Sequence, residues 1–164
     1  MMKVIITSQQ KMFRINTVRV RTLAIWLARQ AGLQNFSTLE ILLIDDAGSA
    51  MANGTVFGRD YVTDVISLAY SPLPGEAGQT GELIINIELA AREGVRRTGG
   101  PDRELALYLA HGCDHLAGAD DATPRERATM RRREVRWMRA AARAGLLQGF
   151  FPRFGKQNRR FFQI

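Results

Sequence analysis

Residues 111–121 read HGCDHLAGADD, and this stretch contains both histidines of the 164-residue chain. His111 and His115 are four residues apart, so on a helix their imidazoles lie one turn apart and can reach a common metal ion. Gly118 can adopt the left-handed conformation that ends a helix and would turn Asp120 and Asp121 back towards the histidines. The pattern H-x-x-x-H-x-x-G-x-x-D therefore predicts a three-ligand metal site with positions left for water or substrate.

The residues before this stretch favour a helix that starts near Pro101 and runs to about Leu116. Leu105, Leu109 and Gly112 share one apolar stripe with Leu116, because spacings of three and four follow the helical period. The two histidines lie roughly opposite that stripe. We therefore expect the apolar stripe to face the core and the histidines to face a cleft.

The rest of the chain predicts a single α+β domain at residues 1–145, with four strands in a mixed sheet and about five helices. Strands are expected at 3–7, 39–44, 63–70 and 81–89, and helices at 18–31, 88–97, 101–116 and 123–144. The stretch 47–60 is rich in small residues and suggests no clear element. Residues 63–70 are apolar on both faces, which predicts a central strand. Residues 146–164 form a basic, aromatic extension.

Composition limits the possible locations and functions of the protein. A hydrophobic content of 46% is enough to form a core, and no run of about 18 apolar residues is present to span a bilayer. The N-terminus lacks the pattern of a signal peptide, so a cytoplasmic protein without membrane contact is expected. The single cysteine, Cys113, fits a reducing compartment and is interpreted as a buried side chain.

The positive charge of the chain is concentrated near its C-terminus. Residues 125–160 contain twelve Arg or Lys against two Glu, while the net charge of the whole chain is +7. A charge run of this kind is often a solvated helix face. Here arginines alternate with phenylalanines in FFPRFGKQNRRFF, as in proteins that bind single-stranded nucleic acid. RNA is therefore the first partner class to test.

Three blocks of the sequence resemble the YbeY family of bacterial endoribonucleases and ribosomal RNA maturation factors. The family's histidine signature reads H-G-x-L-H-L-x-G-Y-D-H, and it is similar to HGCDHLAGADD in this chain. The family's Asn and Thr-Asp-Val blocks are similar to NGTVFGRDYVTDVISLAY. Its Gly-Asp-Ile strand is similar to GELIINIELAARE. The resemblance covers about residues 39–138. It implies a divalent ion, with zinc expected first and nickel or iron also suited to two imidazoles and a carboxylate. It also implies single-stranded RNA and small ribosomal subunit precursors as partners.

The chain departs from the family pattern at two informative positions. Asp121 stands where the family has its third histidine, and it is the preferred third ligand, while the neighbouring Asp120 is assigned to turn hydrogen bonding. Phe57 occupies the position of a family arginine. Arg59, or an arginine of the last helix, would then stabilise charge on the transferred phosphate. Asp64 and Glu82 are both candidates for the general base, although an aspartate after a threonine at a strand start can also serve only to cap the backbone.

Two other functions fit part of the pattern. A ribosome-assembly or RNA-binding protein of the same fold with a weakened nuclease site would explain Phe57 and Asp121. A metallopeptidase shares the histidine spacing, but it needs a glutamate directly after the first histidine, and Gly112 occupies that position. A metal-dependent endoribonuclease that acts in ribosomal RNA processing, with metal ligands His111, His115 and Asp121, is the function we expect.

Overall fold

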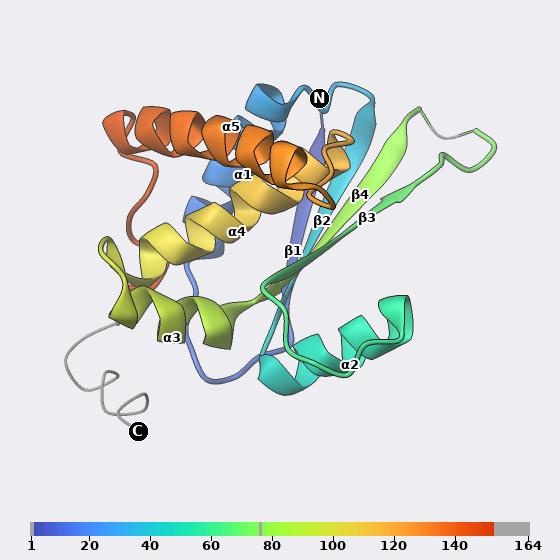
Figure 1. The fold of residues 1–164 in the computed structure, drawn as a ribbon. Coiled ribbons are helices and arrows are strands. Elements are labelled where there is room, and N and C mark those ends of the chain that lie inside the picture. Colours follow the sequence, from blue (N-terminus) through green and yellow to red (C-terminus); the bar gives the residue numbers. More distant parts are fainter. Residues whose placement is uncertain (1, 76, 153–164) are drawn as a thin grey trace.

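The computed structural model describes residues 2–75 and 77–152, and its centre is a four-stranded mixed sheet in the order β1-β2-β4-β3 (Figure 1). The strands are β1 (Lys3–Ser8), β2 (Phe36–Ile44), β3 (Val65–Tyr70) and β4 (Gln79–Asn86). Strands β1, β2 and β4 are parallel, and β3 pairs with β4 in the antiparallel direction. The α+β class and the mixed four-stranded sheet agree with the sequence prediction.

Five helices pack around this sheet within the described residues. They are α1 (Thr17–Ala31), α2 (Asp46–Phe57), α3 (Ile87–Arg96), α4 (Gly100–Leu116) and α5 (Pro124–Arg143). Helices α1, α4 and α5 lie on one side of the sheet, and α2 lies on the other (Figure 1). Helix α4 passes between the sheet and α5, so the histidine helix sits in the middle of the domain.

The main core lies between the sheet and α4. Leu105, Leu109 and Leu116 of α4 are buried there, as the apolar stripe predicts. Gly112 brings α4 close to the sheet, since a Cβ at this position would lie 2.8 Å from Leu83 Cδ2. Close contact along this stripe leaves the opposite side of the helix, with His111 and His115, half-buried.

Two expectations from the sequence differ from the structure. Strand β3 lies at the edge of the sheet, not at its centre. Both of its faces are apolar because Val65 packs into the main core while Ile66 joins a smaller cluster on the other face, which Ala52 of α2 contacts. The small-residue stretch, to which the sequence assigned no element, forms most of α2, whose first turn is capped by the side chain of Asp45 accepting from Gly48 N–H.

The chain after α5 returns to the domain. Phe150 is completely buried, and Phe151 packs edge-on against Phe13 with ring centroids 5.8 Å apart. The backbone N–H groups of Gly149, Phe150 and Phe151 all donate to the Asp102 carboxylate, at 2.6 to 3.1 Å. The first part of the predicted extension is therefore core packing, and residues 153–164 lie outside the described residues.

Among the described residues, we find no helix with the length and apolar character needed to cross a membrane.

Candidate metal centre

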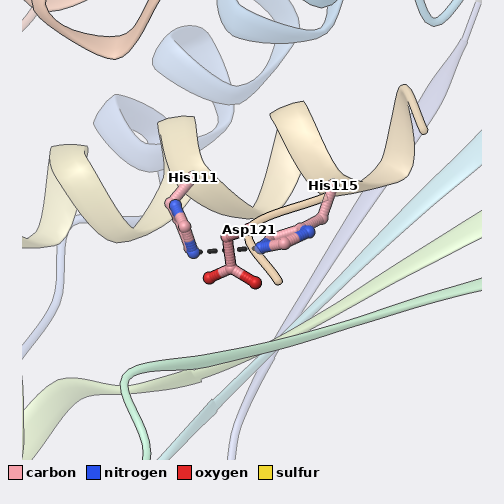
Figure 2. Close-up of side chains that lie close together, drawn as sticks. All are labelled: His111, His115 and Asp121. Atoms are coloured by element: carbon pink, nitrogen blue, oxygen red, sulfur yellow. Dashed lines mark hydrogen bonds between the residues drawn. The ribbon is translucent and has the colours of Figure 1, made fainter. Parts of the chain in front are cut away.

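The two histidines point at each other from consecutive turns of α4. Their Nε2 atoms are 3.0 Å apart, and the two rings are nearly perpendicular (Figure 2). Asp121 reaches the same point from the loop after the helix, so that one ligand atom from each of the three residues lies within 4.8 Å of the others. The structure therefore brings together the three residues predicted as metal ligands.

A glycine turn carries Asp121 to this position. Helix α4 ends at Leu116, and Gly118 follows with φ of 89°, the left-handed region that favours glycine. Asp120 is used in the turn itself, because its Oδ1 accepts hydrogen bonds from the N–H groups of Asp121 and Ala122. Of the two adjacent aspartates, only Asp121 belongs to the three-residue group.

Each imidazole is also held on its other nitrogen. His111 Nδ1 lies 2.6 Å from Glu134 Oε1 of α5, and His115 Nδ1 lies 3.0 Å from the Ala119 carbonyl oxygen. Both partners can accept a hydrogen bond, so a ring that carries its hydrogen on Nδ1 has its Nε2 lone pair available for a metal ion. Such contacts fix the tautomer and orientation that a metal ligand needs.

The electrostatics of His111 follow from this pairing. Burial lowers the pKa of His111, but the hydrogen bond and charge of Glu134 outweigh it, with smaller contributions from Asp64 and Asp121. The net effect is a pKa raised above the ordinary value of histidine. The site is thus an electronegative position that favours a positive charge between the two rings.

These residues fit a divalent metal ion. The two Nε2 atoms lie 3.0 Å apart, within hydrogen-bond distance, and metal–nitrogen bonds of about 2.0–2.1 Å to both atoms are compatible with that separation. Two imidazoles and a carboxylate are the donor set of open catalytic sites, which keep positions for water or substrate. His111, His115 and Asp121 would hold the ion.

A pocket of about 420 Å³ opens beside His111. Its lining includes three carboxylates, Asp64, Glu104 and Glu134, together with Tyr108 and Arg97. Asp64 Oδ1 accepts hydrogen bonds from Val65 N–H at 2.8 Å and the Thr63 hydroxyl at 3.2 Å. Asp64 thus has the backbone role of a strand-start residue and at the same time faces the pocket next to the metal centre.

Arg59 does not line this pocket. It lies in the loop between α2 and β3, where its guanidinium donates to the Tyr61 hydroxyl at 3.3 Å and lies 5.8 Å from the centre of the Phe57 ring. Phe57 and Tyr61 are each more than half exposed, at 52% and 55%. The last residue of α2 and the loop after it therefore present the Arg59 cation and two aromatic rings to solvent, and the loop continues directly to Asp64.

Sequence reasoning missed three carboxylates of this region, of which Glu104 and Asp114 are buried and Glu134 is largely covered. Glu134 contacts His111, Asp114 accepts from Arg133 Nε at 2.9 Å, and Glu104 pairs with Arg97 at 2.7 Å. Burial raises the pKa of Glu104, although Arg97 opposes the shift. The available signal was the single Glu in the sequence RRREVR, an acidic residue within a basic helix that is explained by the histidine it contacts.

Cys113 lies between the two histidines in sequence, but it is not part of the centre. Its side chain is completely buried on the core side of α4. Burial raises the pKa of its thiol to about 12, so the sulfur stays protonated and is neither a thiolate ligand nor a nucleophile. This agrees with its interpretation as a buried side chain.

Comparison with known structures supports the fold. A protein of Thermotoga maritima whose structure was determined in solution superposes with a TM-score of 0.57 over 93% of this chain and 99% of its own, at 15% sequence identity. At this level of identity, the likeness concerns the architecture of the chain. It supports the sheet order and helix arrangement that place the histidines.

Sequence comparisons identify the family. Residues 3–142 match the family model described as Endoribonuclease YbeY. A protein named Endoribonuclease YbeY from Anaeromyxobacter sp. is 32% identical over 144 residues, 88% of this chain and 74% of the relative. One from Rhodopirellula baltica is 37% identical over 101 residues, 60% of this chain and 51% of the relative. The chain therefore belongs to the YbeY family of endoribonucleases.

Proposed function

We propose that this protein is a metal-dependent endoribonuclease that cuts single-stranded RNA during maturation of the small-subunit ribosomal RNA in the cytoplasm. The observation that carries the proposal is the convergence of His111, His115 and Asp121 next to a pocket that His111 lines, in a chain that belongs to an endoribonuclease family. Zinc is the metal we propose, with nickel or iron suited to the same donors.

The residues around the metal centre would have different roles in phosphodiester hydrolysis. A bound divalent ion supplies polarisation of a phosphate oxygen and a lower pKa for bound water. Glu134 holds His111 in the ligand tautomer, and the turn at Ala119 does the same for His115. Asp64 is the candidate general base, because it faces the pocket next to His111 and both of its hydrogen bonds use Oδ1.

The loop between α2 and β3 supports a preference for single strands. Unpaired bases stack on exposed aromatic rings, and Phe57 and Tyr61 are such rings beside the guanidinium of Arg59. Arg59 would stabilise charge on the phosphate when RNA enters along this loop. Phe57 at the family's arginine position thus offers stacking where a cation is otherwise expected.

The experiment is cleavage of a labelled single-stranded RNA by purified protein, with a chelator and with each metal added back. We expect cleavage that the chelator abolishes and that one divalent metal restores. His115→Ala should remove activity while the variant remains folded by circular dichroism. Absence of cleavage with zinc, nickel, iron, manganese and magnesium would contradict the proposal.

The second candidate is an RNA-binding assembly factor of the same fold. It is favoured by Asp121 in place of a third histidine and by the position of Arg59 outside the pocket. In that case a variant with both His111→Ala and His115→Ala would bind small-subunit precursors with the same affinity as the parent protein does. Loss of precursor binding in this double variant would contradict the assembly-factor candidate.

A further inference from the structure

One side of α5 carries an unusual concentration of positive charge. Helix α5 contains eight arginines and two glutamates, and five of its arginines line a single surface groove of about 690 Å³. We name these five the arginine face: Arg131, Arg132, Arg136, Arg139 and Arg143. All five are exposed, and they extend over about 18 Å of helix at 1.5 Å per residue.

The arginine face is separate from the side of α5 that holds the metal centre. Met130, Trp137, Met138 and Ala141 bury the inner side of the helix, and Glu134 contacts His111 from that same side. The groove along the arginine face and the pocket beside His111 share no lining residue. A ligand on the arginine face therefore does not occupy the catalytic pocket.

The described residues hold no carboxylate that is paired with this charge. Within residues 2–75 and 77–152, no ion pair joins a carboxylate to any arginine of the face, and Arg132 contacts only the neutral hydroxyl of Thr129 at 3.0 Å. Arg132 and Arg136 are four residues apart, as are Arg139 and Arg143, a spacing at which like charges destabilise a helix. Bound anions would relieve this repulsion.

We propose that the arginine face is a binding surface for the phosphate backbone of single-stranded RNA, outside the catalytic pocket. A row of guanidinium groups that repeats at each helical turn matches a polyanion in sign and in extended shape. Ala128 and Val135 are the only other lining residues, so the groove offers charge and little apolar surface. Such a surface recognises phosphates without reading the sequence.

The same pattern does not suit a membrane surface. Helices that lie on membranes insert large apolar side chains such as Trp, Phe or Leu into the lipid. The large apolar residues of α5 face the core of the protein, and Trp137 is only 4% exposed. Val135, at 39% exposed, is the largest apolar side chain in the groove. The arginine face therefore fits an RNA backbone better than a lipid bilayer.

This inference rests on the proposed function and extends it, because the arginine face would hold the RNA on either side of the cut. Arg131 lies one helical turn before Glu134, so an RNA on the face runs along the helix that supports the metal centre. The arginine face should then contribute to affinity for long substrates and leave the cleavage step unchanged.

The test is the salt dependence of RNA binding, measured in the presence of a chelator so that no cleavage occurs. All five arginines of the face are changed to glutamine, a residue of similar helix propensity. The control changes five exposed basic residues elsewhere to glutamine and alters the net charge equally: Lys3, Lys11, Arg14, Arg29 and Arg103. A third variant replaces the five arginines of the face with lysine.

Each phosphate contact contributes about 0.7 to the slope of log affinity against log salt for single strands. We expect the slope of the glutamine variant to fall by about 3, with five contacts as the upper limit, while the control changes by less than about 1. The lysine variant should keep the slope. Circular dichroism confirms folding of each variant, and metal content should match the parent.

An equal loss of slope in the glutamine variant and the control would overturn the proposal, as would an unchanged slope in both. Binding of anionic lipid vesicles that the glutamine variant loses, without any change in RNA binding, would assign the face to membranes instead. Failure of the proposed function is distinguishable, because a parent protein that cuts no RNA can still show the predicted difference in slope. Conversely, a parent protein that cuts RNA while the glutamine variant and the control have the same salt slope would contradict the arginine-face proposal alone.

Discussion

Glu134 is the side chain on which the orientation of the metal centre depends most directly. It comes from a different helix than the two histidines, and its side chain is 12% exposed, so its 2.6 Å contact with His111 is largely shielded from water. A shielded carboxylate both aligns the imidazole and makes its other nitrogen more basic. The centre is therefore built by α4, the turn after it and α5 together.

Replacing Glu134 should weaken metal binding without removing a ligand. Glu134→Ala is expected to lower zinc affinity about 10- to 100-fold, and Glu134→Gln less, because its amide oxygen still accepts a hydrogen bond. Competition with a chromogenic chelator measures this directly. Glu93→Ala is the matched control, since Glu93 lines the same pocket without contacting a histidine. Equal affinity in Glu134→Ala and the control would refute the positioning role.

Substitutions at the two adjacent aspartates should have different effects on metal affinity and on stability. Asp121→Ala removes one of the three converging groups and should lower metal affinity more than any change at Asp120. Asp120→Ala loses two hydrogen bonds within the turn and should reduce stability modestly, by about 1–2 kcal/mol. Isothermal titration with zinc distinguishes them. Loss of metal in Asp120→Ala but not in Asp121→Ala would reverse the assignment.

At the scale of single residues, the metal ligands could be predicted from the sequence, but the residues that hold them in place could not. The spacing of His111, His115 and Gly118 follows helical geometry and a glycine turn, both of which are local and readable. Glu134 is 23 residues from His111, and its contact exists only because α5 packs against α4. The distance of Arg59 from the pocket is likewise a property of the loop conformation, which the family resemblance did not reveal.

Helices α4 and α5 are joined near the metal centre by an ion pair between a buried carboxylate and a partly exposed arginine. Asp114, next in sequence to the buried Cys113, is only 3% exposed in its side chain, and Arg133 supplies its partner at 2.9 Å. Arg133 and Glu134 are neighbours, so the pair that joins the helices also sets the position of the carboxylate that holds His111. Stability and metal binding are thus linked through one turn of α5.

Removing the arginine of this pair should be costly. Arg133→Met leaves the Asp114 carboxylate buried without a partner, and the expected loss is about 3 kcal/mol in the free energy of unfolding. Urea denaturation of the metal-free protein measures it. The double variant Asp114→Leu with Arg133→Met should recover most of the loss, because no charge remains buried. A double variant that is as unstable as Arg133→Met alone would show that lost packing, and not an unpaired buried charge, causes the loss of stability.

The segment after α5 should contribute strongly to stability. Phe150→Ala removes a completely buried ring and is expected to cost about 3–5 kcal/mol. Phe57→Ala, at a ring that is 52% exposed, should change stability by less than about 0.5 kcal/mol. Truncation after Gly145 would therefore unfold part of the core, so loss of RNA binding in such a protein is not evidence for a binding tail unless folding is measured as well.

Elements with strong periodicity or clear caps were predictable, and the others were not. Pro101 at the start of α4 and Thr123 before α5 act as expected, and Thr123 and Glu126 form a complete capping box. Helix α2 was missed because its glycines and small side chains give little apolar periodicity, and its stability depends on the Asp45 cap and on contact with the sheet. The edge position of β3 depends on pairing with β4, which local sequence does not specify.

The whole molecule separates its charges by face. The pocket beside His111 contains the carboxylates of Asp64, Glu93, Glu104 and Glu134, whereas the outer side of α5 carries the arginine face. The first arrangement favours a cation and the second a polyanion. Within one domain, the fold thus offers a metal centre and an RNA-binding surface on opposite sides of the same helix.

The most direct test of the account is a titration of metal into metal-free protein, followed in parallel by bound metal and by cleavage of a circular single-stranded RNA. A circular substrate has no ends, so only an endonuclease can open it. We predict that both signals saturate together at one divalent ion per chain, and that His115→Ala abolishes both while the fold persists. Cleavage that is equally fast in the metal-free protein, or in His115→Ala, would contradict the account.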